Sequence, residues 1–312
     1  MTLGQDTWPL SGIQWTISAG ALHAVIVEVG GGLRTFTVGD TPVIDGYAED
    51  EMCPAGAGQI LAPWPNRVGN GRYTFNGAQY QLPINEPDKS NAIHGLVRWL
   101  RWHVVEHYPD SVTVECALPA QPGYPFPLLL RTVWSMRPDG LTAEHTVTNI
   151  GAVSAPFGFG VHPYFRIGDV PLQELRLYIP AATHLMVDER RLPVREESVV
   201  DTPEDFTLPR PIGDTILDTA YTNLMRESDR NVHVRLDAPD GRSLDIWADQ
   251  SFGWLQVFTA DTLPPPRRRR SVAVEPMTCP PDALRSGHDL GVLAVGETWR
   301  GHWGVTVNFQ GP

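Results

Sequence analysis

The amino-acid sequence predicts an all-β fold, a large antiparallel β-sandwich. Hydrophobic and polar residues alternate with period two along much of the 312-residue chain, and turn signals separate the alternating segments. Helical periodicity is thin. Many short strands joined by tight turns are typical of antiparallel sandwiches. No linker or shift in composition divides the chain, so we expect one domain over residues 1–312.

Several of the expected strands are paired by recognisable turns. Asn76-Gly77 is the strongest hairpin signal, because a two-residue type I′ turn favours Asn followed by Gly. Pro138-Asp139-Gly140 and Pro239-Asp240-Gly241 are expected to join two further pairs. Single helical turns are expected only near 203–206 and 281–284. The residues expected to share a face within each strand are Val25, Val27 and Val29; Tyr73 and Phe75; Tyr80 and Leu82; Val112, Val114, Cys116 and Leu118; Leu130, Thr132, Trp134 and Met136; Leu141, Ala143, His145 and Val147; Val232, Val234 and Leu236; Leu244, Ile246 and Ala248; and Trp303, Val305, Val307 and Phe309.

The composition argues against several classes of partner. A formal net charge of −12 suits neither nucleic acid nor an anionic membrane surface. No apolar run approaches the roughly 20 residues that cross a bilayer, and the start, Met1 to Asp6, lacks the pattern of a signal peptide. Cys53, Cys116 and Cys279 are too few and too scattered for a disulfide framework. We therefore expect a cytoplasmic protein without nucleic-acid or membrane partners.

Lysine is almost absent from the chain. Of the 24 basic residues only Lys89 is a lysine, and it lies in Pro87-Asp88-Lys89-Ser90, a sequence typical of a solvated turn. Schiff-base aldolases, pyridoxal-phosphate enzymes and P-loop nucleotide enzymes each need a functional lysine in a particular setting. These chemistries are therefore not expected, and we expect no cofactor.

Four short polar segments stand out in Gly- and Pro-rich surroundings. They contain two histidines, an arginine and a glutamate, which together supply an acid, a base and a cationic hydrogen-bond donor. No second metal ligand lies at short spacing from either histidine, so we expect no metal, and no Gly-x-Ser-x-Gly motif indicates a serine hydrolase. The segments are Pro65-Asn66-Arg67, Asn91-Ala92-Ile93-His94-Gly95, Gly160-Val161-His162-Pro163-Tyr164-Phe165 and Ala273-Val274-Glu275-Pro276-Met277.

Glu275 and His162 are the candidates for proton transfer. Glu275 alternates with Val272 and Val274, so a strand here would point its carboxylate away from the valine face. Pro276 favours an extended backbone at Glu275 and is expected to end the strand there. His162 is preceded by glycines and followed by Pro163, which fixes the chain beside an imidazole able to act near neutral pH.

Taken together, these segments resemble the aldose 1-epimerase (mutarotase) family. The resemblance runs from about Gly30 to Phe309, and its motifs occur in the family's order. They are the run from Pro63 to Tyr73, Asn91-Ala92-Ile93-His94-Gly95, Gly160-Val161-His162-Pro163-Tyr164-Phe165, Leu217-Asp218 and Ala273-Val274-Glu275-Pro276. The resemblance implies a galactose mutarotase-like supersandwich with an open sugar-binding cleft.

By the same resemblance, Glu275 would be the general base on the anomeric hydroxyl and His162 the general acid on the ring oxygen. The residues expected to hydrogen-bond sugar hydroxyls are Asn66, Arg67, His94 and Asp218. Asp214 lies close enough in sequence to leave the choice between it and Asp218 open. The function implied is a cofactor-independent aldose 1-epimerase that interconverts the anomers of an aldohexose.

The sequence departs from the well-known galactose mutarotases, which makes it a divergent bacterial-type branch. Leu96-Val97-Arg98 follows His94-Gly95, and Pro276-Met277-Thr278-Cys279 follows Glu275. The sugar, its phosphorylation and the oligomeric state stay open. Alternatives are a hexose-6-phosphate 1-epimerase using Arg98, Arg101 or Arg267–Arg270, a non-catalytic sugar-binding module, and a glycosidase using Asp218 and Glu275. The Arg267–Arg270 run, after three prolines, is itself expected to be a solvated loop without a catalytic part.

Overall fold

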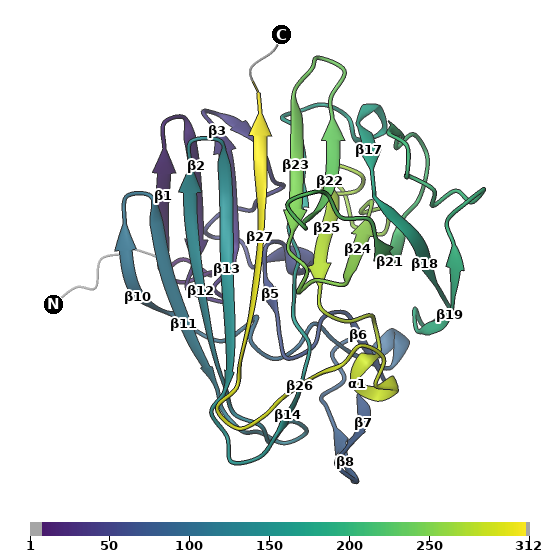
Figure 1. Ribbon diagram of the computed structural model, residues 1–312. Helices are drawn as coiled ribbons and strands as arrows, with labels where there is room; N and C mark the ends of the chain where they lie inside the picture. Colours follow the sequence, from purple (N-terminus) through teal and green to yellow (C-terminus); the bar gives the residue numbers. More distant parts are fainter. Residues whose placement is uncertain (1–7, 310–312) are drawn as a thin grey trace, which may run out of the picture.

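The computed structural model describes residues 8–309, and its largest element is a nine-stranded antiparallel sheet that forms one layer (Figure 1). Long alternating segments build its centre, where β12, β13 and β27 pair over most of their length. Its strands, in spatial order, are β10 (His103–Tyr108), β11 (Ser111–Leu118), β12 (Leu128–Arg137), β13 (Gly140–Asn149), β27 (Thr298–Asn308), β23 (Ser243–Ala248), β22 (Val232–Asp237), β17 (Arg176–Tyr178) and β20 (Arg210–Pro211).

Two further antiparallel sheets lie behind this layer in Figure 1. The four-stranded sheet consists of β1 (Gln14–Ala19), β2 (Leu22–Val27), β3 (Leu33–Val38) and β4 (Thr41–Pro42). The other has the order β19 (Pro193–Ser198), β18 (Ala181–Val187), β21 (Asp218–Leu224), β24 (Trp254–Phe258), β25 (Val272–Met277), β15 (Gly160–Val161) and β5 (Ile60–Leu61), with β16 (Tyr164–Phe165) also paired to β25.

The remaining elements are short. No helix within residues 8–309 has the length and apolar character needed to cross a bilayer. The short strands pair as β6 (Arg67–Gly69) with β9 (Asn91–Ile93), β7 (Arg72–Phe75) with β8 (Ala78–Gln81), and β14 (Ala155–Phe157) with β26 (Gly291–Leu293); the helical turns are η1 (Pro54–Gly56), η2 (Pro87–Lys89), η3 (Leu172–Glu174) and α1 (Ala283–Ser286).

The all-β antiparallel prediction is confirmed, and the predicted turns form. Asn76 and Gly77 have φ of 49° and 78°, as a type I′ turn requires, and they join β7 to β8. The two Pro-Asp-Gly turns connect β12 to β13 and β22 to β23. The expected faces of β11, β12, β13, β22 and β23 are all buried, and they belong to one hydrophobic cluster with the four-stranded sheet.

Two local expectations are wrong. The core face of β2 is that of Leu22, Ala24 and Ile26, because these residues face the large sheet. Of the face expected from the sequence, Val27 is buried, while Val25 and, just beyond the strand, Val29 are half-buried. Residues 203–206 form turns instead of a helical turn, whereas α1 forms where one was expected. The start of the chain, on which the signal-peptide expectation rests, lies outside the described residues.

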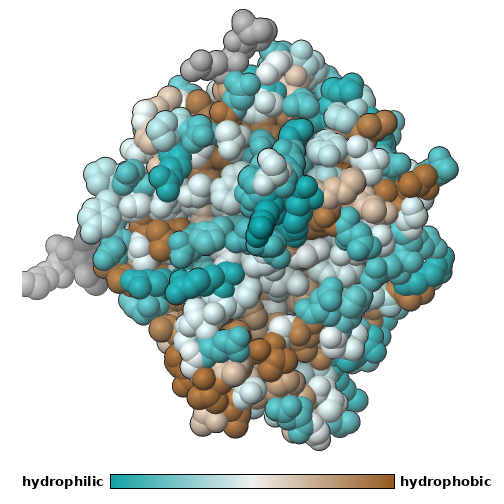
Figure 2. Space-filling model, viewed as in Figure 1, coloured by the Kyte–Doolittle hydropathy of each residue, from teal (hydrophilic) through white to brown (hydrophobic). Residues whose placement is uncertain are grey.

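The Arg267–Arg270 loop is less solvated than expected. Arg267 and Arg270 both pair with the buried carboxylate of Asp45, at 3.2 and 2.9 Å, and Arg269 pairs with Asp261 at 2.7 Å. The loop is therefore held by ion pairs to the protein's own acids. In the view of Figure 2 most of the surface is hydrophilic or neutral, and brown residues gather toward the lower end, where Figure 1 places β14 and β26.

Candidate active site

Glu275 lies in the middle of β25, inside the sheet of β24 and β21. Its side chain is only 2% exposed, and its cross-strand neighbour in β24 is Gln256. Burial raises the pKa of Glu275 well above its ordinary value, and the negative charge of Asp218 adds to the rise, while Arg67 opposes it. One carboxylate oxygen, Oε2, has no hydrogen-bond partner among the described residues. Glu275 is thus a buried carboxyl group that tends to hold a proton.

Strand β25 does not end at Glu275, as the sequence suggested, but continues through Pro276 to Met277. The N–H of Val274 donates to the carbonyl of Pro163, so the nitrogen of Pro276 points to the same side of the strand. On that side β16 pairs with the start of β25 and β15 with its end, which leaves a gap between them. Proline is tolerated there because no ladder hydrogen bond is needed.

His162 occupies this gap between β15 and β16 and faces Glu275. Its Nε2 lies 3.3 Å from Oε1 of Glu275, and its ring stacks on Tyr164 with the centroids 4.8 Å apart. The hydroxyl of Tyr164 donates to the carbonyl of Ala55, which fixes the stacking ring. Burial lowers the pKa of His162 to about 3, with the charges of Arg98 and Arg67 contributing. The imidazole is therefore neutral in the unliganded protein.

The β6–β9 ladder places Arg67, Asn66 and His94 beside this pair. The N–H of His94 donates to the carbonyl of Asn66, and the rings of His94 and His162 meet edge to face at 5.2 Å. His94 has a positive φ of 65°, followed by Gly95, where a Cβ atom would lie 2.1 Å from the carbonyl oxygen of Ala62. Only glycine fits at that position, so it is required to turn His94 toward His162.

The guanidinium of Arg67 is held in place by Glu86. Its Nε and Nη2 donate to the two oxygens of Glu86 at 2.9 Å each, and Asn91 also donates to that carboxylate. Burial acts to raise the pKa of Glu86, but the hydrogen bonds and charge of Arg67 outweigh it, so the pKa is lowered. Arg67 keeps Nη1 directed at the side chain of Asn66, at 3.3 Å.

Asp218, at the start of β21, lines the same small void as Asn66 and Arg67. Its Oδ1 accepts a hydrogen bond of 2.8 Å from Gln256, and its Oδ2 is 3.5 Å from Nε of Arg191. Asp214, by contrast, is exposed in a turn. The structure thus brings Asp218, and not Asp214, to the candidate site.

Gln256, Arg191 and Glu86 contact the candidate residues but were not expected from the sequence. Gln256 carries an additional buried oxygen, Oε1, without a partner among residues 8–309. Nothing local marks these three residues, because their positions depend on strand register and on a turn far away in the chain. Gln256 shares a face of β24 with Trp254 and Phe258.

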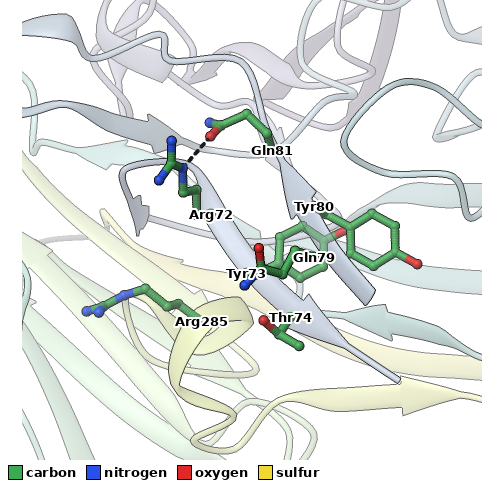
Figure 3. Close-up of a pocket in the computed structure, with 7 residues that line it drawn as sticks. All are labelled: Arg72, Tyr73, Thr74, Gln79, Tyr80, Gln81 and Arg285. Carbon is green, nitrogen blue, oxygen red and sulfur yellow. Dashed lines mark hydrogen bonds between the residues drawn. The ribbon is translucent and has the colours of Figure 1, made fainter. Parts of the chain in front are cut away.

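The hollow among the expected sugar-binding residues is small in this structure. Asn66, Arg67, Arg191, Asp218 and Gln256 contribute to the lining of a void of only about 10 Å³, room for about one water molecule. A much larger groove of about 680 Å³ lies between the β7–β8 hairpin and α1 (Figure 3). None of the candidate catalytic or sugar-binding residues lines it. The groove residues are Arg72, Tyr73, Thr74, Gln79, Tyr80, Gln81 and Arg285.

The arrangement can transfer protons between a buried carboxyl group and a buried imidazole that contact each other, next to several hydrogen-bonding side chains. Within residues 8–309, no three His, Cys, Asp or Glu side chains are gathered as a metal site would require. The edge-to-face packing of the rings of His94 and His162 is a contact between neutral histidines, since the pKa of His94 is also lowered well below its ordinary value, mainly by burial.

Comparison with known proteins identifies the family of the chain. The family model described as Aldose 1-epimerase matches residues 14–306. Uncharacterized protein YihR of Escherichia coli is 36% identical over 292 residues, covering 93% of this chain and 92% of its own. An aldose 1-epimerase of Streptococcus thermophilus is 24% identical, covering 86% and 82%. The structure of the GalM/aldose epimerase homologue from C. elegans superposes with a TM-score of 0.85 at 19% identity, covering 95% and 98%. The chain belongs to the aldose 1-epimerase family.

Proposed function

We propose that this protein is an aldose 1-epimerase that interconverts the α and β anomers of an aldohexose without a cofactor. The observation that carries the proposal is the contact of 3.3 Å between Nε2 of His162 and Oε1 of Glu275 in a buried site. The family supports epimerase chemistry, and the geometry supplies an acid and a base for it.

The pair has to hold one mobile proton. In the unliganded protein that proton resides on Glu275, because burial raises the pKa of the carboxyl group and lowers that of the imidazole. Its transfer from Oε1 to Nε2 produces a carboxylate beside an imidazolium, which is the form that ring opening requires. A sugar hydroxyl and ring oxygen placed at the pair would stabilise this form by hydrogen bonds to both charged groups.

Ring opening then needs one proton in each direction. Glu275 removes the proton from the hydroxyl on C1, and the electrons of that O–H bond form the C1 carbonyl. The C1–O5 bond breaks, and its electrons remain on O5, which takes the proton of His162. Rotation about C1–C2 presents the other carbonyl face, and reclosure with the proton transfers reversed gives the other anomer. A well-placed acid or base contributes about 10²–10⁴-fold to such a step.

The surrounding side chains would bind and orient the sugar. Arg67 and Asn66 donate from one side, and Asp218 accepts from the other; His94 lies against His162. Because the void is so small, a sugar has to displace Arg191 from its contact with Asp218. In this proposal Gln256 is a further hydroxyl ligand, since its buried Oε1 lacks a partner.

A non-catalytic sugar-binding module fits the site less well. A binder needs hydroxyl contacts, whereas burying an ionisable carboxyl group against a histidine is unfavourable unless it serves the chemistry. The buried pair therefore favours turnover over binding alone.

Polarimetry on freshly dissolved α-anomers of glucose and galactose tests the proposal. We expect the protein to accelerate the change in rotation well above the buffer rate and Glu275→Gln to abolish most of that acceleration. Glu144→Gln, an exposed glutamate on β13, is the matched control and should behave as the wild type. A wild-type protein that leaves the rate at the buffer value with neutral and phosphorylated hexoses alike would refute the proposal.

A further inference from the structure

Among the arginines of residues 8–309 that are not exposed to solvent, Arg98 alone has a guanidinium without a hydrogen bond or an ion pair. Its Nε is buried without a partner. The arginines with partners are Arg34, Arg67, Arg166, Arg190, Arg191, Arg210, Arg226, Arg242, Arg267 and Arg269.

The backbone of Arg98 is tied to the candidate active site. Gln59 donates from its side chain to the carbonyl of Arg98 at 2.9 Å, and the carbonyl of Gln59 accepts from the N–H of His162 at 3.1 Å. Arg98 also follows His94 by four residues. Its charge lowers the pKa of both His94 and His162, and in each case it acts more strongly than Arg67. The charge of Arg98 therefore acts on the histidine end of the site, to which its backbone is linked through Gln59.

Among the described residues, no acidic side chain forms an ion pair with Arg98. The thiol of Cys53 is near enough to respond to Arg98, but burial raises its pKa to about 12, so it is neutral. Glu275, which contacts His162, tends to hold its proton because burial raises its pKa. The ring of Trp99 lies 5.5 Å from Cζ of Arg98, which stabilises the cation only weakly.

The other arginines that could recognise an anion are already occupied. Arg267 and Arg270 are paired with Asp45, and Arg269 with Asp261. Arg101 is 71% exposed and lies 3.8 Å from Glu28. Arg98 is thus the one arginine of the sequence-predicted candidates that is partly buried, near the site and without a partner in the described chain.

A partly buried guanidinium without a counterion is unfavourable, and it matches an oxyanion through its fork of N–H donors. We propose that Arg98 binds an oxyanion on the substrate, so that the sugar is an aldohexose with a phosphate or carboxylate group at C6. The proposal rests on the proposed function, because that function defines how the sugar is oriented. His162 protonates O5, and C6 is attached to the carbon next to O5, so a C6 substituent lies on the histidine side, toward Arg98.

The test compares the kcat/KM values for anomer exchange, measured by magnetisation-transfer NMR with glucose, glucose 6-phosphate and glucuronate. We expect the wild type to prefer at least one of the two anionic sugars over glucose by tenfold or more. Arg98→Gln should reduce this preference at least tenfold, mainly through a higher KM, and Arg98→Lys should restore part of it. The sugar that shows the preference identifies the oxyanion as phosphate or carboxylate.

Arg101→Gln is the matched control, because this exposed arginine lies only three residues further along the chain; it should keep the wild-type preference. A wild type that prefers glucose over both anionic sugars, or an Arg98→Gln variant with an unchanged preference, would overturn the proposal. Calorimetry with 1,5-anhydroglucitol and its 6-phosphate, which lack the anomeric hydroxyl, separates the two proposals. Binding of the phosphate that weakens at least tenfold in Arg98→Gln supports the oxyanion site even if no sugar is turned over, whereas Arg98-independent binding contradicts it.

Discussion

Two histidines are buried in different layers of this molecule, and both have a pKa lowered to about 3 by burial. His145, in the nine-stranded sheet, has both nitrogens satisfied: Trp303 donates to its Nε2 at 2.9 Å, and its Nδ1 lies 2.9 Å from the hydroxyl of Thr132. His162, in the gap beside β25, has no partner on Nδ1 within the described chain and faces a buried carboxyl group through Nε2.

The comparison shows that a perturbed pKa does not by itself mark a functional histidine. Burial shifts both residues in the same direction, but only His162 leaves hydrogen-bonding capacity unused and contacts a second ionisable group. Buried polar groups are nearly always satisfied in folded proteins, so unsatisfied ones are the better sign of a binding or catalytic role. Glu275 Oε2, His94 Nδ1 and Gln256 Oε1 share this property.

The largest effects are expected from two single variants, His162→Gln and His145→Gln, of which the first should lose activity and the second stability. We expect His162→Gln to lower kcat at least about 10²-fold, because it removes the acid, while the protein stays folded. His145→Gln should leave the turnover of the folded protein close to wild type. It should instead lower the free energy of unfolding by about 1–3 kcal/mol, because the hydrogen bonds with Trp303 and Thr132 are disturbed. Polarimetry and denaturant unfolding of both variants check this, and equal losses of turnover would remove the distinction.

Arg67→Ala should have the next largest effect, of a different kind. Hydroxyl contacts exist in both the ground state and the transition state, so the variant should raise KM as well as lower kcat. The loss should exceed that of Arg72→Ala, an exposed arginine on β7 that serves as the control. Steady-state kinetics with a neutral hexose measure both constants. A normal KM in Arg67→Ala would show that this arginine only holds Glu86.

The smallest effect concerns the stability of the site itself. The folded-state pKa of Glu275 is raised above its unfolded value, so its ionisation favours the unfolded chain, increasingly as the pH rises above about 4. Glu275→Gln should therefore raise Tm near pH 7 by roughly 2–4 °C, the shift that about 1 kcal/mol produces in a large domain. The gain should vanish below about pH 4, where the carboxyl group is protonated in both states. A Tm that falls at pH 7 would mean that Glu275 is ionised and stabilising.

Much of this fold could be predicted from the sequence because alternation and turn chemistry act locally. The hairpins at Asn76-Gly77 and at the two Pro-Asp-Gly turns are examples, as is the interior face that includes His145. The core face of β2 was predicted wrongly because both faces of that strand carry apolar residues. The face that packs against the large sheet is the buried one.

For the site, Glu275 and His162 could be recognised by their Gly- and Pro-rich contexts and by their resemblance to a family. Gln256 and Arg191 could not, because they reach Asp218 only through the pairing of β24 with β21 and through the turn after β18. The partners of the Arg267–Arg270 loop were equally hidden, since Asp45 is more than 200 positions away in the chain.

The pH dependence of kcat/KM for a neutral hexose tests most directly the claim that His162 and Glu275 share one mobile proton. In the active form, the pair carries one proton. The population of this form decreases as the pH falls toward the lowered pKa of His162, about 3, because a second proton binds. It also decreases as the pH rises through the raised pKa of Glu275, because the pair then loses its proton. We therefore predict that kcat/KM does not fall on the acid side until the pH approaches about 3. An inflection near pH 6.5, the ordinary pKa of a histidine, would contradict the account, because it would show that the imidazole titrates independently of Glu275.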